Sequence, residues 1–295
     1  MDFIDILQYA ISGLSQGSLY ALVALGIVLV YRANRVLNFA HGDVTTAGAF
    51  VAFYLMGAGL SWWLAFLLAI VFGAVIAMLF YFGVLVPAQR REASHLGMVI
   101  LTLGFGLVIQ SLVLEFGTLE PQTFPFPLSD QLTFNVGGVI ISQLSLGTLV
   151  FGIAGSILFY LLVQKTPIGL AMRATSENLP AAQTLGIPTR RVLALSWGMA
   201  AGLGVLAGLF LAAVLFLDPN FMLEPFLKGF AAAILGGLNS LPGAIVGGLV
   251  LGVAEALAGG LISVAFKNTL AFLIIIFVLL LRPEGLLGTE FVERV

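Results

Sequence analysis

Nine apolar runs determine what this chain can fold into. A helix needs about 20 predominantly apolar residues to cross a bilayer, with roughly 17 to 25 tolerated. We therefore expect an all-α fold, a polytopic transmembrane helical bundle of about eight or nine spans, because the second, seventh and last runs are short or interrupted. The runs cover residues 6–31, 38–58, 62–86, 96–116, 138–163, 192–217, 225–240, 242–263 and 267–281.

The composition excludes a soluble globular domain, since 60% of the residues are hydrophobic and only 9% are charged. The length suits one polytopic membrane domain over residues 1–295. The absence of cysteine excludes disulfide and thiolate chemistry. The opening residues MDFIDIL hold two acids and no base, which is a poor signal peptide. We therefore expect the first span to be retained.

The positions of lysine and arginine predict the orientation of the chain. Cytoplasmic loops of membrane proteins carry an excess of these residues. With the N-terminus outside and the C-terminus in the cytoplasm, only Lys228 and Lys267 fall on the outer side. The ten bases then on the inner side are Arg32, Arg35, Arg90, Arg91, Lys165, Arg173, Arg190, Arg191, Arg282 and Arg294.

The longest stretch without a predicted span is 165–191, which holds four of the 12 basic residues. Thr166-Pro167 is typical of a helix start, Asn178 of the cap of a second short helix, and Gly186 of its end. We expect two short helices outside the bilayer, with an ordinary cytoplasmic loop as the alternative. Their exposed apolar face would consist of Leu179, Ala182 and Leu185.

Polar residues interrupt the start of the second apolar run. A span broken in this way is typical of binding sites and gates in transporters, because ionisable groups at membrane depth are costly. The alternative is that these side chains lie in the cytoplasmic headgroup layer. The candidates for a translocation pathway here are Asn38, His41, Gly42 and Asp43, with Asn34, Thr45 and Thr46 as polar neighbours.

A second candidate for the pathway lies where two short apolar segments meet at Asn239, Pro242 and Gly243. Just before it, Glu224 and Lys228 stand four residues apart, and we expect a solvated ion pair on a helix surface at the outer boundary. Glu255 lies within an apolar span with no base near it in the sequence. It is either a functional carboxylate or a structural acid bonded to a neighbouring helix.

Small residues four apart recur in the spans and predict close helix packing. The pairs are Gly13/Gly17, Gly198/Gly202, Gly204/Gly208, Gly243/Gly247 and Gly248/Gly252.

No motif in the chain indicates an enzyme. His41 and His95 are far apart, and no cluster of metal ligands, GxSxG motif or phosphate-binding loop is present. We therefore expect no catalytic residue, metal or cofactor, and a lipid bilayer rather than nucleic acid as the surroundings. An ion-coupled secondary transporter that uses Asp43 or Glu255 as its proton carrier remains an alternative, as does an intramembrane hydrolase.

Five segments, taken in order, resemble the branched-chain amino acid permeases of bacterial ABC importers, and in particular the subunit usually called the H permease. The resemblance runs nearly from end to end. It rests on VLNFAHGDVTTAGAFVA at 36–52, ILTLGFGLVIQSLV at 100–113, AMRATSENLPAAQTLGIPTRRVLALSW at 171–197, LKGFAAAILGGLNSLPGAIVGGLVLGVAEAL at 227–257 and LRPEGLLG at 281–288.

The resemblance implies a single permease domain in the bacterial inner membrane that forms half of a translocation pathway. Its partners would be a second, related permease, two cytoplasmic ATPase subunits and an extracytoplasmic solute-binding protein. ATP would be hydrolysed on the ATPase subunits. A short cytoplasmic helix within the coupling loop 165–191 would dock on an ATPase, which assigns that role to Arg173, Glu177, Asn178, Ala182, Leu185 and Gly186. Relatives that carry other amino acids, urea or amides leave the ligand open.

Overall fold

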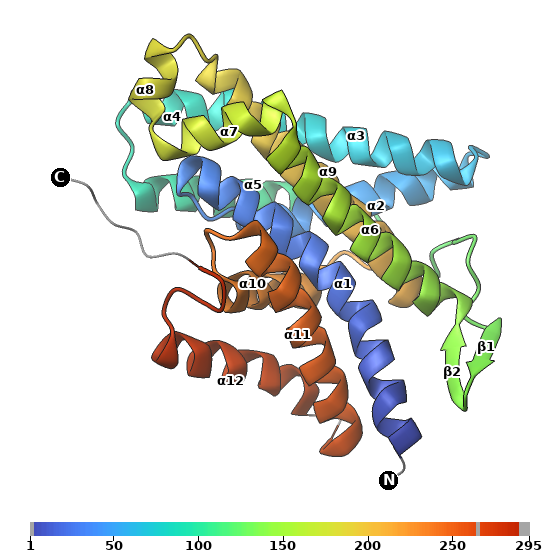
Figure 1. Ribbon diagram of the computed structural model, residues 1–295. Coiled ribbons are helices and arrows are strands. Elements are labelled where there is room, and N and C mark those ends of the chain that lie inside the picture. Colours follow the sequence, from blue (N-terminus) through green and yellow to red (C-terminus); the bar gives the residue numbers. More distant parts are fainter. Residues whose placement is uncertain (1–2, 264–265, 289–295) are drawn as a thin grey trace. The chain divides into compact units, whose positions relative to one another are not determined.

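The computed structural model describes residues 3–263 and 266–288, and most of these residues are helical (Figure 1). The prediction of an all-α polytopic membrane fold is confirmed. The elements in chain order are α1 (Phe3–Asn34), α2 (His41–Gly57), α3 (Trp62–Phe80), the π-helical turn η1 (Tyr81–Leu85), α4 (Val86–Arg90), α5 (His95–Phe116), β1 (Thr133–Val136), β2 (Val139–Ser142), α6 (Gln143–Lys165), α7 (Pro167–Glu177), α8 (Leu179–Thr184), α9 (Thr189–Val214), α10 (Leu223–Gly236), α11 (Leu241–Leu261) and α12 (Phe266–Leu281).

Among the described residues, six helices are long and apolar enough to cross a membrane. They are α1, the continuous helix Trp62–Arg90, α5, α6, α9 and α11. The helices α2, α10 and α12 have only 17, 14 and 16 residues. These three occupy the runs that the sequence marks as short or interrupted. The count of eight or nine spans is therefore not confirmed.

The fifth apolar run differs from its prediction, because a β-hairpin takes up its start. β1 and β2 pair antiparallel, with Val136 opposite Val139. Gly137 and Gly138 adopt positive φ angles of 64° and 93° between them, as a two-residue hairpin turn requires. The β-branched residues of 139–141 then continue as a strand, so α6 begins only at Gln143.

The chain divides into two compact units. Unit 1 comprises Met1–Val28, Leu128–Ile157 and Leu227–Val295, and unit 2 comprises Leu29–Pro127 and Leu158–Phe226. The helices α1, α6 and α10 each contribute residues to both units. Each unit is described by itself below.

In unit 2, α9 packs against both α2 and α3 at the side chain of Val205. A Cβ atom at Gly48 of α2 would lie 2.5 Å from Cγ2 of Val205, and one at Gly73 of α3 would lie 2.6 Å from the same atom. Two glycines thus let two helices approach one valine of α9 from different sides. Close approach of this kind is how membrane helices gain packing energy without a hydrophobic driving force.

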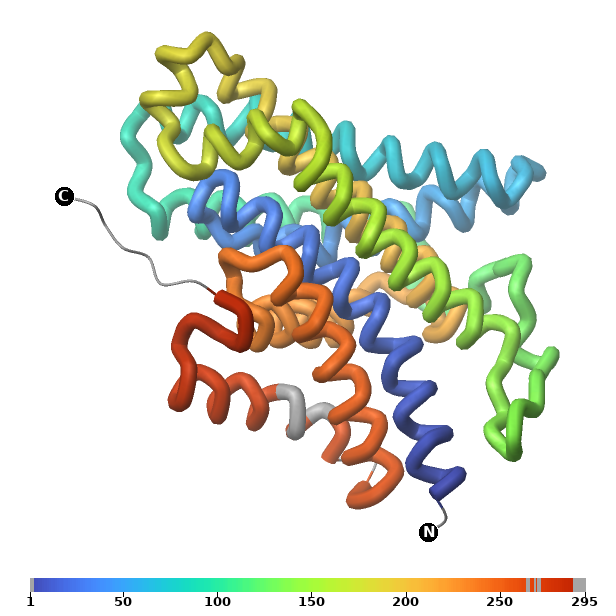
Figure 2. Tube along the Cα trace, viewed as in Figure 1, coloured from blue at the N-terminus to red at the C-terminus, as the bar shows by residue number. Residues whose placement is uncertain are grey.

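In unit 1, α1 and α11 cross at their glycines. A Cβ atom at Gly13 would lie 2.6 Å from the carbonyl oxygen of Gly252, and one at Gly17 would lie 2.7 Å from that of Gly248. The predicted use of these two glycine pairs for helix packing is confirmed. The helices α10, α11 and α12 follow one another in the C-terminal third of the chain, as the tube in Figure 2 shows.

Candidate functional site

The segment between α6 and α9 forms the predicted pair of short helices, α7 and α8. The Thr166 hydroxyl caps α7 by accepting from the Gly169 amide at 3.2 Å. The Asn178 side chain caps α8 by accepting from the Ala181 amide at 2.9 Å. Gly186 follows α8 with φ at 78°, a conformation that glycine adopts without strain. The prediction of two capped helices in this stretch is confirmed.

The exposed surface of α8 differs in part from its prediction. Leu185 is 78% exposed, and Glu177, Asn178 and Leu179 are exposed as well. Ala182 is only 2% exposed, so its inclusion in the exposed face is wrong. The helix has six residues, and its one buried side is the side that carries Ala182.

Arg173 fastens α7 to the end of α6. Its guanidinium donates to the side-chain oxygen of Gln164 at 2.9 Å and to the Gln164 carbonyl at 3.2 Å. Arg173 also borders a small cavity that Arg32, Met172 and Ser176 help to line. Its contacts therefore position α7, whereas Glu177 and Leu185 are available to another molecule.

The predicted break at the start of the second apolar run is present. α1 ends at Asn34 and α2 begins at His41, and between them the Asn38 side chain accepts from the Ala40 amide at 3.1 Å. Asn38 and His41 are buried. Both side chains are therefore shielded by the protein itself, and the choice between a pathway and the cytoplasmic headgroup layer stays a prediction.

Two glycines make room for the ionisable side chains of α2. A Cβ atom at Gly204 of α9 would lie 2.8 Å from Nε2 of His41, and one at Gly106 of α5 would lie 2.5 Å from Oδ2 of Asp43. Neither ring nitrogen of His41 has a hydrogen-bond partner among the described residues. The predicted cluster Asn38, His41, Gly42 and Asp43 thus lies at one helix start, packed against α5 and α9.

The second predicted break, at Asn239–Gly243, is also present. α10 ends at Gly236, and Ser240 caps α11 by accepting from the Gly243 amide at 3.0 Å. The sequence did not predict that residues 284–288 cover this break. The amides of Leu286 and Leu287 donate to the carbonyls of Leu235 and Gly236 at 2.8 and 3.1 Å.

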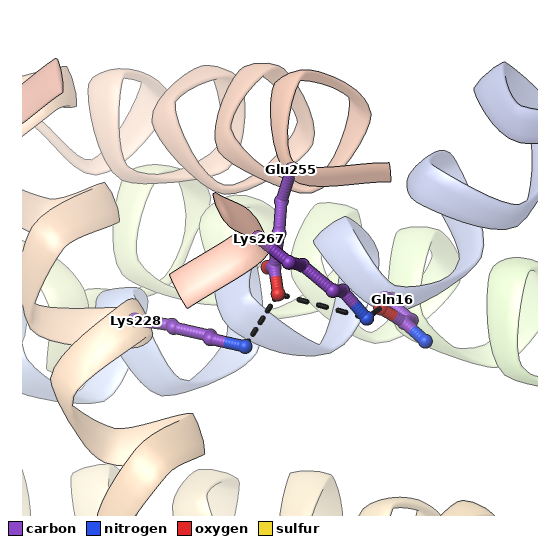
Figure 3. A network of polar contacts seen from close by, with 4 residues as sticks. All are labelled: Gln16, Lys228, Glu255 and Lys267. Atoms are coloured by element: carbon purple, nitrogen blue, oxygen red, sulfur yellow. Dashed lines mark hydrogen bonds and ion pairs between the residues drawn. The ribbon is translucent and has the colours of Figure 1, made fainter. Parts of the chain in front are cut away.

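Glu255 does not stand alone, and Lys228 is not a solvated rim residue. Lys228 is buried and donates to Oε1 of Glu255, which is itself fully buried. Nζ of Lys267 lies 3.7 Å from the same oxygen and donates to Gln16 at 3.3 Å (Figure 3). The prediction that Lys228 is solvated at the outer boundary is thus wrong, because Lys228 is buried and donates to a carboxylate on another helix.

The sequence carried one signal for this cluster. Lys228 and Lys267 are the two bases that the inner loops do not account for, and Glu255 is a carboxylate within an apolar span.

Glu255 lies 12 residues beyond Gly243 on α11, which corresponds to about 18 Å along a helix. Glu255 therefore does not form one site with Asn239, Pro242 and Gly243. No group of three or more possible metal ligands occurs in the part of the chain that the structure describes.

Comparisons with known proteins agree over nearly the whole length. Residues 9–281 match the family model described as "Branched-chain amino acid transport system / permease component". The chain is 33% identical to the high-affinity branched-chain amino acid transport system permease protein BraD of Pseudomonas aeruginosa, over 98% of each chain. It is 32% identical to LivH of Escherichia coli K12, over 99% of each chain.

A more distant relative and one solved structure extend the comparison. A probable branched-chain amino acid transport permease protein of Methanocaldococcus jannaschii is 30% identical, over 92% of this chain and 90% of its own length. The solved structure of PsaBC from Streptococcus pneumoniae in complex with Fab aligns with a TM-score of 0.52 at 14% identity, over 96% of this chain and 94% of that chain. At that identity the structure supports the fold alone.

Proposed function

The chain belongs to the family of permease components of branched-chain amino acid transport systems, and we propose that it forms half of the membrane pathway of an ATP-driven importer. The ligand class is branched-chain amino acids, as the names of the relatives BraD and LivH state for those proteins. The chain lies in the bacterial inner membrane as a multi-pass protein. The N-terminus is outside and the C-terminus is in the cytoplasm, as the distribution of lysine and arginine favours.

One observation supports the importer mechanism most directly, and it is the geometry of α7 and α8. Each helix has a side-chain cap at its N-terminus, and Glu177, Asn178 and Leu185 remain exposed. An exposed leucine beside polar groups is suited to a groove on another protein. We assign the docking on the ATPase to this surface, with Arg173 holding α7 in place, Ala182 packing α8 and Gly186 ending it.

The partners follow from that assignment. A second, related permease completes the pathway, two cytoplasmic ATPase subunits supply the energy, and an extracytoplasmic binding protein delivers the ligand. ATP binding moves the ATPases, and α7 and α8 transmit that movement to α6 and α9, between which they lie in the chain. A ligand must bind one state better than the other for this coupling to work.

The pathway passes the two helix breaks, Asn38–Asp43 and Asn239–Gly243. Asn38, His41, Gly42 and Asp43 are polar or small at a helix start, where transporters expose backbone and side-chain groups to a substrate. Because residues 284–288 bind the end of α10 and lie beside Asn239, movement of that segment would open the second break.

Charge reversal on the exposed helix pair tests the proposal. Glu177→Lys should reduce ATP-dependent leucine uptake at least tenfold, because the side chain is exposed and its reversal disturbs docking but not the packing of the chain. Uptake is measured in proteoliposomes that contain the complete complex with its binding protein. Glu120→Lys is the matched control, since Glu120 is exposed on the loop between α5 and β1, which lies outside in the predicted orientation.

Two results would contradict the coupling assignment. The first is normal uptake by the Glu177→Lys complex. The second is uptake by the isolated chain without ATPases, abolished by an ionophore, which would make the protein a secondary transporter. Equal loss in the Glu120→Lys control would likewise remove the support for α7 and α8.

A further inference from the structure

A charged cluster lies within unit 1, on helices that carry few other ionisable groups. Glu255 of α11 faces Lys228 of α10 and Lys267 of α12, and Gln16 of α1 completes the group (Figure 3). The Glu255 side chain is fully buried, and that of Lys228 is nearly so. Charges within membrane helices are costly and commonly belong to a substrate or ion pathway. The cluster therefore needs an explanation beyond helix packing.

In this cluster the carboxylate of Glu255 faces the ammonium groups of Lys228 and Lys267. Lys228 donates to Oε1 of Glu255, and Lys267 lies 3.7 Å from that same oxygen. Oε2 of Glu255 accepts no hydrogen bond from the described residues, although it is buried. Lys267 otherwise donates to the neutral amide of Gln16. A donor for an anion and an acceptor for a cation thus lie side by side.

We propose that this cluster is a subsite for the charged backbone groups of an α-amino acid. Lys267 receives the ligand carboxylate, and Oε2 of Glu255 receives the ligand ammonium group. This inference rests on the proposed function, since it names how the importer recognises its ligand class. A zwitterion supplies one charge of each sign, so it satisfies both groups without changing the net charge of the cluster.

The exposure of the three side chains gives the direction of approach. The exposed fraction falls from 31% for Lys267 to 8% for Lys228 and 0% for Glu255. A ligand therefore meets Lys267 first. The four side chains of the cluster offer only charged and amide groups, so the cluster distinguishes α-amino acids from neutral amides and not leucine from valine.

The rival explanation is an ion pair that only fastens α10 to α11. That explanation rests on Lys228 and Glu255, and it gives Lys267 only the longer contact of 3.7 Å to Oε1 of Glu255. It also predicts that an uncharged pair of similar volume would serve as well, because replacing a buried ion pair by apolar groups is often neutral or stabilising. A substitution of Lys267, and a double substitution that neutralises both Lys228 and Glu255, therefore separate the two explanations.

The first experiment removes the ammonium group of Lys267. Lys267→Met leaves the Lys228–Glu255 pair intact and should lower leucine uptake at least tenfold in proteoliposomes with the complete complex. ATP hydrolysis stimulated by the loaded binding protein should stay within twofold of the parent, so that the amount of leucine carried per ATP falls. Lys267→Arg should restore most of the uptake. Arg90→Met, which removes an exposed base elsewhere, is the control.

The second experiment neutralises the pair. Lys228→Met combined with Glu255→Gln should give a complex that assembles and hydrolyses ATP but fails to carry leucine. Uptake by this variant at the parent level would establish the fastening role and overturn the subsite. Uptake by Lys267→Met within twofold of the parent would also overturn it.

The composition of the vesicles separates a ligand carboxylate from a lipid anion. The effect of Lys267→Met should be equal in vesicles of phosphatidylcholine alone and in vesicles that contain phosphatidylglycerol. An effect seen only with the anionic lipid assigns Lys267 to a headgroup and overturns the proposal. If the parent complex itself carries no amino acid, the proposed function fails, whereas a normal parent with unaffected variants contradicts only the subsite.

Discussion

Single side chains decide how the exposed helix pair is held. Asn178 accepts from the Ala181 amide and thereby starts α8, which has only six residues and few contacts to compensate for a lost cap. Asn178→Ala should therefore destabilise α8 by about 1 kcal/mol. Hydrogen exchange should speed up at the amides of 181–184 and remain unchanged in α9. Asn178→Ser retains a capping oxygen and is the control, and equal exchange in both variants would contradict the role of the cap.

The same residues show how far local sequence patterns reach. Thr166, Pro167, Asn178 and Gly186 predicted the bounds of α7 and α8 because a cap acts within one helical turn. The partner of Lys228 could not be predicted in this way. Its carboxylate stands 27 residues further along the chain, and the nearer Glu224 fits a helix-surface pair equally well. Local spacing identifies helix ends, whereas burial selects ionic partners between helices.

At the scale of elements, one valine of α9 sets the distance to two neighbouring helices. Gly48→Ala and Gly73→Ala should each destabilise the protein by about 1–3 kcal/mol, since the added Cβ would overlap Val205. Val205→Ala should relieve the steric overlap in both glycine variants. Each double variant with Val205→Ala should therefore be more stable than the sum of its two single effects predicts. Thermal unfolding of the complex in detergent measures this.

The matched control for the glycine variants is Gly104→Ala on α5, where nothing lies within 4 Å of the added Cβ. That variant should be neutral or slightly stabilising, because alanine is the better helix former. If Val205→Ala failed to relieve either glycine variant, α9 would not be the element that sets both distances.

The elements also show where hydrophobic runs mislead. Long helices such as α5 and α9 coincide closely with their predicted spans, because length and hydropathy suffice for them. The run 138–163 starts instead as a strand, since Gly137 and Gly138 close a hairpin whose register no apolar count reveals. Likewise, residues 284–288 are held at the end of α10 by backbone hydrogen bonds, which side-chain identity does not predict.

At the scale of the whole molecule, the orientation in the membrane decides whether the proposed coupling is possible. The chain has no cysteine, so single cysteines can be introduced without any other change. Leu185→Cys and Leu119→Cys place a thiol at sites that are 78% and 73% exposed. In right-side-out vesicles that contain the chain without ATPase subunits, a membrane-impermeant maleimide should label Cys at 119 at once and Cys at 185 only after the membrane is opened.

This outcome follows from the loops in which arginine and lysine collect. Arg173, Arg190 and Arg191 flank Leu185 in the sequence, whereas Leu119 lies in a stretch free of bases between Arg91 and Lys165. Of the two bases predicted on the outer side, Lys228 is buried, so only Lys267 remains as an exception to the excess of bases on the inner side. Arg294 lies outside the described residues. Labelling of Cys at 185 from the outside would place α7 and α8 away from ATP. The energy source would then have to reach the chain by another surface.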